Sequence, residues 1–294
     1  MLRILLFTAT NFAIMIVISV VWSLLGLDKM LLNSGISVGI VQVLPFALAF
    51  GMGGSIVSLL ISKWMAIRST GAQLITDPSN KVERWLVDTV AKQAEAAGIG
   101  MPDVAVFQSA QPNAFATGAS RNNALVAVST GLLHNMSQNE VEAVLAHEVS
   151  HVANGDMVTM TLLQGILNTF VLIFSRVIGQ TIDQVVFKSK GRGIGYFVGT
   201  MVAQVALSFL AQIIVMWFSR YREHRADEGG ARLAGKANMI AALVRLETQQ
   251  PADKAVGLPD DVAAMGILGA GGLSKLFMSH PPIGERIAHL QNLG

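Results

Sequence analysis

Ala146-His147-Glu148-Val149-Ser150-His151 is the stretch that decides what kind of protein this chain forms. In a helix, His147 and His151 stand one turn apart on the same face, because residues at i and i+4 superpose at about 100° per residue. Two imidazoles placed in this way can bind one zinc ion, and Glu148 borders the same pocket as a general base. The segment therefore predicts a metal site and its base on one helical turn.

The residues on either side of this stretch favour a helix. Ser137 followed by Glu140 forms a capping box, and residues 141–152 combine good helix formers with apolar spacing. Asn154-Gly155 is typical of a helix that stops. An ordinary helix with two exposed histidines is the alternative, because five-residue matches of this kind also arise by chance. The helix alone leaves both interpretations open.

A second motif, about seventy residues later, offers a third metal ligand. The segment Arg222-Glu223-His224-Arg225-Ala226-Asp227 follows an apolar stretch. A catalytic zinc site has three protein ligands and one open position, so the two histidines need one more ligand, and Glu223 is the best candidate. Asp227, one helical turn later, is placed to orient a histidine as an outer carboxylate. The alternative is that both acids form surface ion pairs with the neighbouring arginines.

Taken together, these motifs resemble those of the HtpX-like membrane-bound zinc metalloproteases, relatives of the CAAX prenyl endopeptidases. The matching pieces cover nearly the whole chain in the family's order: Asn113-Ala114-Phe115-Ala116-Thr117-Gly118, residues 147–156, residues 223–227, and His280-Pro281-Pro282 with Arg286-Ile287. The resemblance implies an integral membrane endopeptidase with a gluzincin-like catalytic domain facing the bacterial cytoplasm. It also implies quality control of damaged or misfolded membrane proteins under stress.

Composition agrees with a membrane protein. The chain is 52% hydrophobic and 14% charged, whereas soluble domains are about 25% charged. Charge-free stretches long enough to cross the hydrocarbon core predict membrane spans at 4–27, 36–62, 157–178 and 194–218, although in the third the charge-free part ends before Arg176 and is only just long enough. The first could instead be a cleaved signal peptide, but its apolar run is too long for one. The last two could form a re-entrant pair rather than cross fully.

The basic residues predict how the chain is oriented. Arg3, Lys63, Arg68, Arg220 and Arg222 all fall on one side if four spans cross, and the positive-inside tendency makes that side the cytoplasm. The loop 187–192 does not fit this orientation, because it would carry three basic residues on the outer side of the membrane. A net charge of +2 is too slight to indicate nucleic-acid binding, and cysteine is absent, so zinc must be held by nitrogen and oxygen.

The expected fold is an α-helical membrane protein with an α+β catalytic domain, mainly helical with a small sheet. The domain is assembled from residues 67–155 and 219–294. Residues 104–107 and 124–128 have the composition of short strands, and residues 120–123 carry turn residues between them. Helical patterns near 82–97 and 285–293 complete the domain.

The ligand set implies the chemistry. One zinc ion per chain, held by His147, His151 and Glu223, activates a water, and Glu148 accepts the proton of that water. His280, which the resemblance places near the zinc, is the candidate donor to the oxyanion. Polypeptides, above all membrane proteins, are the expected substrates.

The resemblance further places Asn113, Ala114 and Phe115 beside the substrate cleft, where an edge strand can add a peptide by backbone hydrogen bonds. A buried turn that stabilises the sheet is the alternative there. A catalytically silent membrane scaffold or metal sensor, and a CAAX-type prenyl peptidase, are the rival functions.

Overall fold

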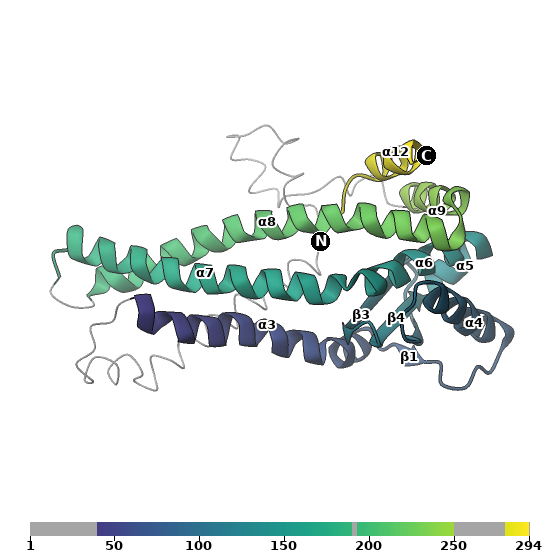
Figure 1. The fold of residues 1–294 in the computed structure, drawn as a ribbon, viewed down its shortest axis with the longest axis horizontal. Helices are drawn as coiled ribbons and strands as arrows, with labels where there is room; N and C mark the ends of the chain where they lie inside the picture. The colour runs from purple at the N-terminus through teal and green to yellow at the C-terminus, as the bar shows by residue number, and fades with distance from the viewer. Residues whose placement is uncertain (1–39, 190–192, 250–279, 294) are drawn as a thin grey trace. The chain divides into compact units, whose positions relative to one another are not determined.

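The computed structural model describes residues 40–189, 193–249 and 280–293 (Figure 1). The described residues divide into two compact units, one formed by those within 40–57 and 161–215, the other by those within 58–160 and 216–293. Three long helices contribute to both units: α3 (Ile40–Thr70), α7 (Asp156–Val185) and α8 (Ile194–Ala234). The predicted span 4–27 and the first residues of the span 36–62 lie outside the described residues.

These three helices are, among the described residues, long and apolar enough to cross a membrane. They carry large hydrophobic side chains on their outer surfaces, and Phe170, Phe197 and Phe209 are each more than half exposed. Water would not favour such a surface, whereas lipid hydrocarbon would. The helices are therefore the structural counterpart of the charge-free stretches in the sequence.

Helix α7 continues beyond the predicted boundary at residue 178, to Val185. Arg176, which made the end of this segment uncertain, lies within the helix, and its guanidinium donates to the Leu172 carbonyl at 2.8 Å. A long arginine side chain can reach its own helix backbone, so the charge does not end the helix. Helices α7 and α8 pack closely at Gly179. A Cβ atom added at this glycine would lie only 2.7 Å from the backbone nitrogen of Thr200, so the close packing requires glycine.

The second unit contains one mixed sheet of four strands in the order β1-β2-β4-β3. The strands are β1 (Gln73–Leu74), β2 (Asp103–Phe107), β3 (Ala114–Ser120) and β4 (Asn123–Ser129). Strands β2 and β4 are parallel, while β3 and β4 form an antiparallel hairpin with Ser120 opposite Asn123. The predicted small sheet and the predicted turn at 120–123 are confirmed, and β3 lies at an edge of the sheet.

Side chains alternate between the two faces of this sheet, as they must in a strand. Val104, Val126 and Val128 face a core shared with the helices α4 (Lys81–Ala96), α6 (Gln138–Asn154), α9 (Lys236–Gln249) and α12 (Ile283–Asn292). Ala105, Leu125 and Ala127 face the other way, towards Ala66 and Ile67 of α3. The sheet thus has helices on both faces, and α6 packs between β3 and α9.

Local signals fix the two ends of α6. The Ser137 side chain accepts from the Glu140 amide and the Glu140 carboxylate accepts from the Ser137 amide, which is the capping box expected from the sequence. Gly155 ends the helix in the left-handed conformation at φ 69°, a conformation that favours glycine. Because α7 begins at the next residue, this turn joins the histidine helix directly to a candidate membrane span. The short helix α5 (Thr130–Asn135) precedes α6.

Candidate metal centre

Three side chains from two helices converge in the second unit. His147 and His151 come from α6, and Glu223 comes from the polar part of α8. Their ligand atoms all lie within 4.8 Å of one another, and Glu223 is only 1% exposed. The structure therefore brings together the three residues that the sequence predicted as zinc ligands, although Glu223 lies about seventy residues after the two histidines.

The distances between these atoms fit a zinc ion. The Nε2 atoms of His147 and His151 are 3.1 Å apart, and the Glu223 oxygens lie 3.6 Å and 3.3 Å from them. Tetrahedral zinc about 2.0–2.1 Å from each ligand separates ligand atoms by about 3.3–3.4 Å. Two imidazoles with one carboxylate is also a donor set that zinc uses in catalytic sites. The residues present thus suit this metal.

Each histidine is held from behind by a buried carboxylate. The Nδ1 atom of His147 lies 2.9 Å from Asp227 of α8, as expected for the outer carboxylate. The Nδ1 atom of His151 lies 2.6 Å from Asp156, which is 3% exposed. A carboxylate on Nδ1 fixes the tautomer and turns Nε2 towards the metal position. Sequence reasoning missed Asp156, although it closes the Asn-Gly-Asp run directly after the zinc helix.

A buried arginine completes the polar network. Arg286 of α12 donates from Nε to Asp227 at 2.7 Å and through a second nitrogen to the other oxygen of the same carboxylate. Arg286 is only 8% exposed, so the two opposite charges are paired away from water, and the two hydrogen bonds fix the plane of the carboxylate. Arg286 was visible in the sequence only as part of the C-terminal motif. Its function could not be assigned without the fold.

Glycine permits helix α8 to approach the histidine helix. A Cβ atom at Gly230 would lie 3.2 Å from the backbone nitrogen of His147, which is tighter than ordinary contact. The pair Gly229-Gly230 thus brings the two backbones together one turn after Asp227. Without that approach, the carboxylates of α8 could not reach the imidazoles of α6.

The carboxylates shape the electrostatics of the histidines. Burial disfavours a charged ring at His147, but hydrogen bonds to Asp227 and Glu223 outweigh it and raise the pKa of His147 to about 9. Burial acts in the same sense at His151, where the hydrogen bond to Asp156 and that to Glu223 raise the pKa. The carboxylates thus create a negative electrostatic potential at the two facing imidazoles, which favours their protonated form. The same field favours a divalent cation.

The remaining predicted residues occupy different positions around this cluster. Glu148 is half-buried beside His147 on α6. His280 is 60% exposed, and its Nδ1 atom lies 2.6 Å from a Glu223 oxygen, so its ring stands at the edge of the cluster.

Asn113 lies just before β3 and pairs with Ser129 through its backbone. The Phe115 ring packs on Phe107 with ring centroids 5.5 Å apart, so this side chain belongs to the sheet core.

Comparison with known proteins identifies the family. Residues 80–293 match the model of peptidase family M48. The chain belongs to this family. It is 56% identical over 292 residues to protease HtpX of Pseudoalteromonas atlantica, covering 99% of both chains, and 56% identical over 294 residues to a protease HtpX homologue of Thiobacillus denitrificans, again covering 99% of both.

A solved structure shares the fold. The crystal structure of Ste24p from S. mikatae is similar with a TM-score of 0.61 and 20% identity. The match covers 84% of this chain and spans 58% of that one. The family and its relatives confirm the prediction of a zinc-dependent metalloprotease embedded in a membrane, with a mainly helical fold and a small mixed sheet.

Proposed function

We propose that this M48 peptidase hydrolyses peptide bonds at a zinc ion held by His147, His151 and Glu223, with Glu148 as the general base. The observation that carries the proposal is the convergence of the three ligands within 4.8 Å of one another, with the two histidines on α6, the helix that also carries Glu148, and Glu223 on α8. A site that only bound metal would not need a further carboxylate beside two histidines. When bound, zinc polarises the scissile carbonyl and lowers the pKa of a water to about 7.

The protein residues divide the remaining work. Glu148 accepts the proton of the attacking water and passes it to the leaving amine, a transfer that contributes about 10²–10⁴-fold. Asp227 and Asp156 keep the histidines in the tautomer that presents Nε2. His280 donates to the oxyanion from the edge of the cluster, a contribution of about 10²–10³-fold that falls on kcat because the charge develops only in the transition state.

Strand β3 is proposed to bind the substrate by backbone hydrogen bonds along its free edge. Asn113 exchanges hydrogen bonds with Ser129, and in an antiparallel ladder the bonded pairs alternate. Phe115 therefore also points its backbone groups at β4, whereas those of Ala114 and Ala116 point outwards. A peptide added to this edge would bond to Ala114 and Ala116. Of the three residues predicted from the sequence, Ala114 is thus the one whose backbone suits substrate binding.

We further propose that the catalytic unit faces the cytoplasm at the bacterial inner membrane and that the substrates are damaged or misfolded membrane proteins. Support comes from the basic residues that follow the apolar stretches and from the relatives named protease HtpX. The spans at 4–27, 36–62, 157–178 and 194–218 belong to this proposal. Reporter fusions after Lys63 and after Arg222 should both report the cytoplasm. A fusion at Ser189 that also reports the cytoplasm would exclude the crossing of the last two segments.

The decisive experiment is Glu148→Gln in purified full-length protein. Glutamine keeps the size and hydrogen bonding of the side chain but cannot accept the proton, so hydrolysis of an unfolded protein substrate should fall by about 10²–10⁴-fold or more. Zinc content should stay near one ion per chain. Near-normal turnover would exclude Glu148 as the base, and loss of zinc would place it among the ligands.

His280→Ala is the companion variant. It should lower kcat while leaving zinc content and KM largely unchanged, because an oxyanion donor acts in the transition state. An unchanged kcat would make His280 an ordinary loop residue. If wild-type protein also lacked activity on every peptide substrate while binding zinc, the silent-scaffold alternative would gain support.

A further inference from the structure

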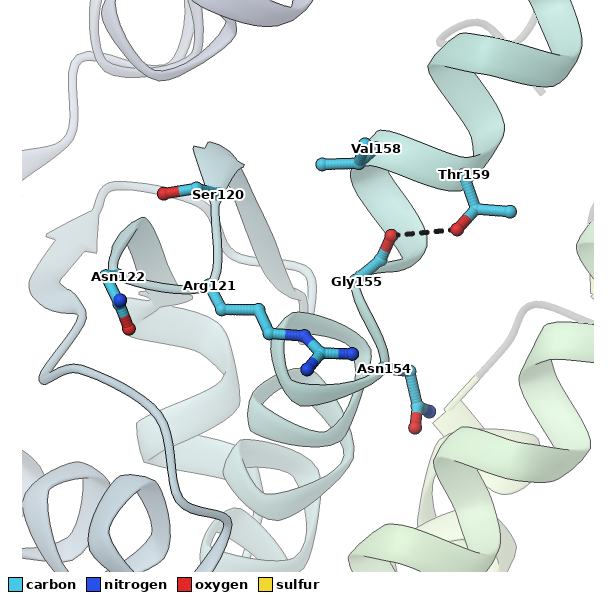
Figure 2. Close-up of a pocket in the computed structure, with 7 residues that line it drawn as sticks. All are labelled: Ser120, Arg121, Asn122, Asn154, Gly155, Val158 and Thr159. Carbon is cyan, nitrogen blue, oxygen red and sulfur yellow. Dashed lines mark hydrogen bonds between the residues drawn. The ribbon is translucent and has the colours of Figure 1, made fainter.

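A hollow of about 440 Å³ lies between the turn of the β3–β4 hairpin and the corner that joins α6 to α7 (Figure 2). The residues around it come from these two places alone, and none of them belongs to the metal cluster. None of the residues of the proposed catalytic mechanism lines this hollow, so its function must be considered separately.

Arg121, at the hairpin turn, is the positively charged side chain among the residues that line this hollow. Its guanidinium extends from the turn towards the α6–α7 corner (Figure 2), and a Cβ atom at Gly155 would lie 3.5 Å from its Nε atom. Across the described ranges, Arg121 forms no ion pair or hydrogen bond. A guanidinium offers five N–H donors in a planar fork that matches phosphate geometry. The side chain is thus free to bind an anion.

Across from the arginine, the α6–α7 corner contributes one apolar side chain, Val158, beside the polar Asn154 and Thr159. Val158, in the first turn of α7, points its side chain towards the hairpin (Figure 2). A free inorganic anion would gain nothing from this contact, because apolar surface cannot replace its hydration. An anion attached to hydrocarbon would gain from both sides. The hollow therefore suits an amphipathic anion.

The ends of the apolar stretches in the second unit carry residues that are typical of a membrane boundary. Lys63 of α3 donates to Asn123 of the hairpin at 3.2 Å, and the next residue, Trp64, is 64% exposed. On α8, Trp217 and Tyr221 are also more than half exposed where the apolar stretch ends. Tryptophan and tyrosine gather at headgroup depth. Val158 stands three residues into a candidate span.

We propose that this hollow binds the phosphate group of an anionic phospholipid, with Arg121 on the phosphate and Val158 against the adjoining hydrocarbon. A lipid bound there ties the hairpin turn, and with it one end of the edge strand β3, to the membrane surface. The site is independent of the catalytic assignments, because it requires only that the chain is embedded in a membrane.

The test compares Arg121→Gln with Arg84→Gln in full-length protein in neutral detergent. Arg84 is an exposed arginine on α4 of the same unit, so its replacement removes the same charge from a surface away from the hairpin. Binding of a short-chain phosphatidylglycerol is measured by the rise in Tm and by titration. Arg121→Gln should weaken binding about fivefold or more, while Arg84→Gln should bind like the wild type.

Two further ligands separate the sources of the phosphate. Short-chain phosphatidylcholine carries the same phosphodiester together with a choline cation that offsets its charge, so it should bind more weakly than phosphatidylglycerol. Inorganic phosphate at the same concentration should give no Arg121-dependent rise in Tm. Equal phosphatidylglycerol affinity in Arg121→Gln and wild type would overturn the proposal. An equal response to inorganic phosphate would overturn its lipid part.

Discussion

The two parts of helix α8 follow opposite rules. From Ile194 to Val215 the helix exposes large hydrophobic side chains such as Phe197 and Met201, which are each about 60% exposed. From Met216 to Ala234 it buries carboxylates, with Glu223 at 1% and Asp227 at 0% exposure. One continuous helix thus presents apolar groups outwards in one unit and hides charges in the other.

The difference teaches that each part depends on its surroundings rather than on helix propensity. Exposed phenylalanine is stable where hydrocarbon replaces water, and a buried carboxylate is stable where histidine, arginine or a metal ion answers its charge. Helix α7 repeats the pattern, because the buried Asp156 opens a helix that then becomes apolar. Variants that remove one kind of partner should therefore leave the other part unaffected.

The largest effect is expected for Glu223→Ala. It removes a proposed ligand, so the zinc affinity should fall by more than the 10–100-fold typical of outer carboxylates, and proteolysis should be lost with the metal. Zinc content is measured after dialysis against a weak chelator. Glu228→Ala, five residues later on the same helix and only half-buried, is the matched control and should keep its zinc. Stoichiometric zinc in Glu223→Ala would exclude it as a ligand.

Asp227→Asn should cost both stability and zinc. The variant leaves the Arg286 charge buried without a counter-charge, which typically destabilises by about 3–5 kcal/mol, and it weakens the support of His147. Thermal unfolding in detergent and zinc titration report the two effects. Adding Arg286→Met should restore much of the Tm but not the zinc affinity. Recovery of both would show that Asp227 only neutralises the arginine.

Asp156→Asn isolates the support of His151. Asparagine suits the start of a helix as well as aspartate does, so α7 should begin normally. The His151 ring loses its anionic partner, and zinc affinity should fall about 10–100-fold with little change in Tm. Competition with a chelating dye measures the affinity. Wild-type affinity in this variant would make Asp156 merely a helix-capping residue.

The smallest effect should come from the apolar unit. Gly179→Ala places a Cβ atom against the Thr200 backbone and should destabilise by about 1–3 kcal/mol, while the zinc affinity of the folded protein stays unchanged. Gly53→Ala, with nothing within 4 Å of its Cβ position, is the control and should keep the wild-type Tm. A loss of zinc affinity in Gly179→Ala would show that packing of the apolar helices reaches the metal cluster.

Local signals made much of this molecule predictable. The capping box at Ser137 and the glycine stop at Gly155 set the limits of α6, and helical spacing then put both histidines on one face. The charge-free stretches indicated the three apolar helices. Helix α7 runs on to Val185, beyond the end of the predicted span at residue 178, and Arg176 within it bonds to its own helix.

What the sequence by itself determined is therefore the zinc helix with its two imidazoles, the helical patterns near 82–97 and 285–293 and the membrane character, since each depends on neighbours within a few residues or on composition. Only the tertiary structure decided which carboxylate supports which imidazole and what Arg286 does. It also decided which backbone groups of β3 face outwards. These depend on the approach of α8 to α6 at Gly229-Gly230, on the docking of α12 and on the register of the hairpin, all of which join residues distant along the chain.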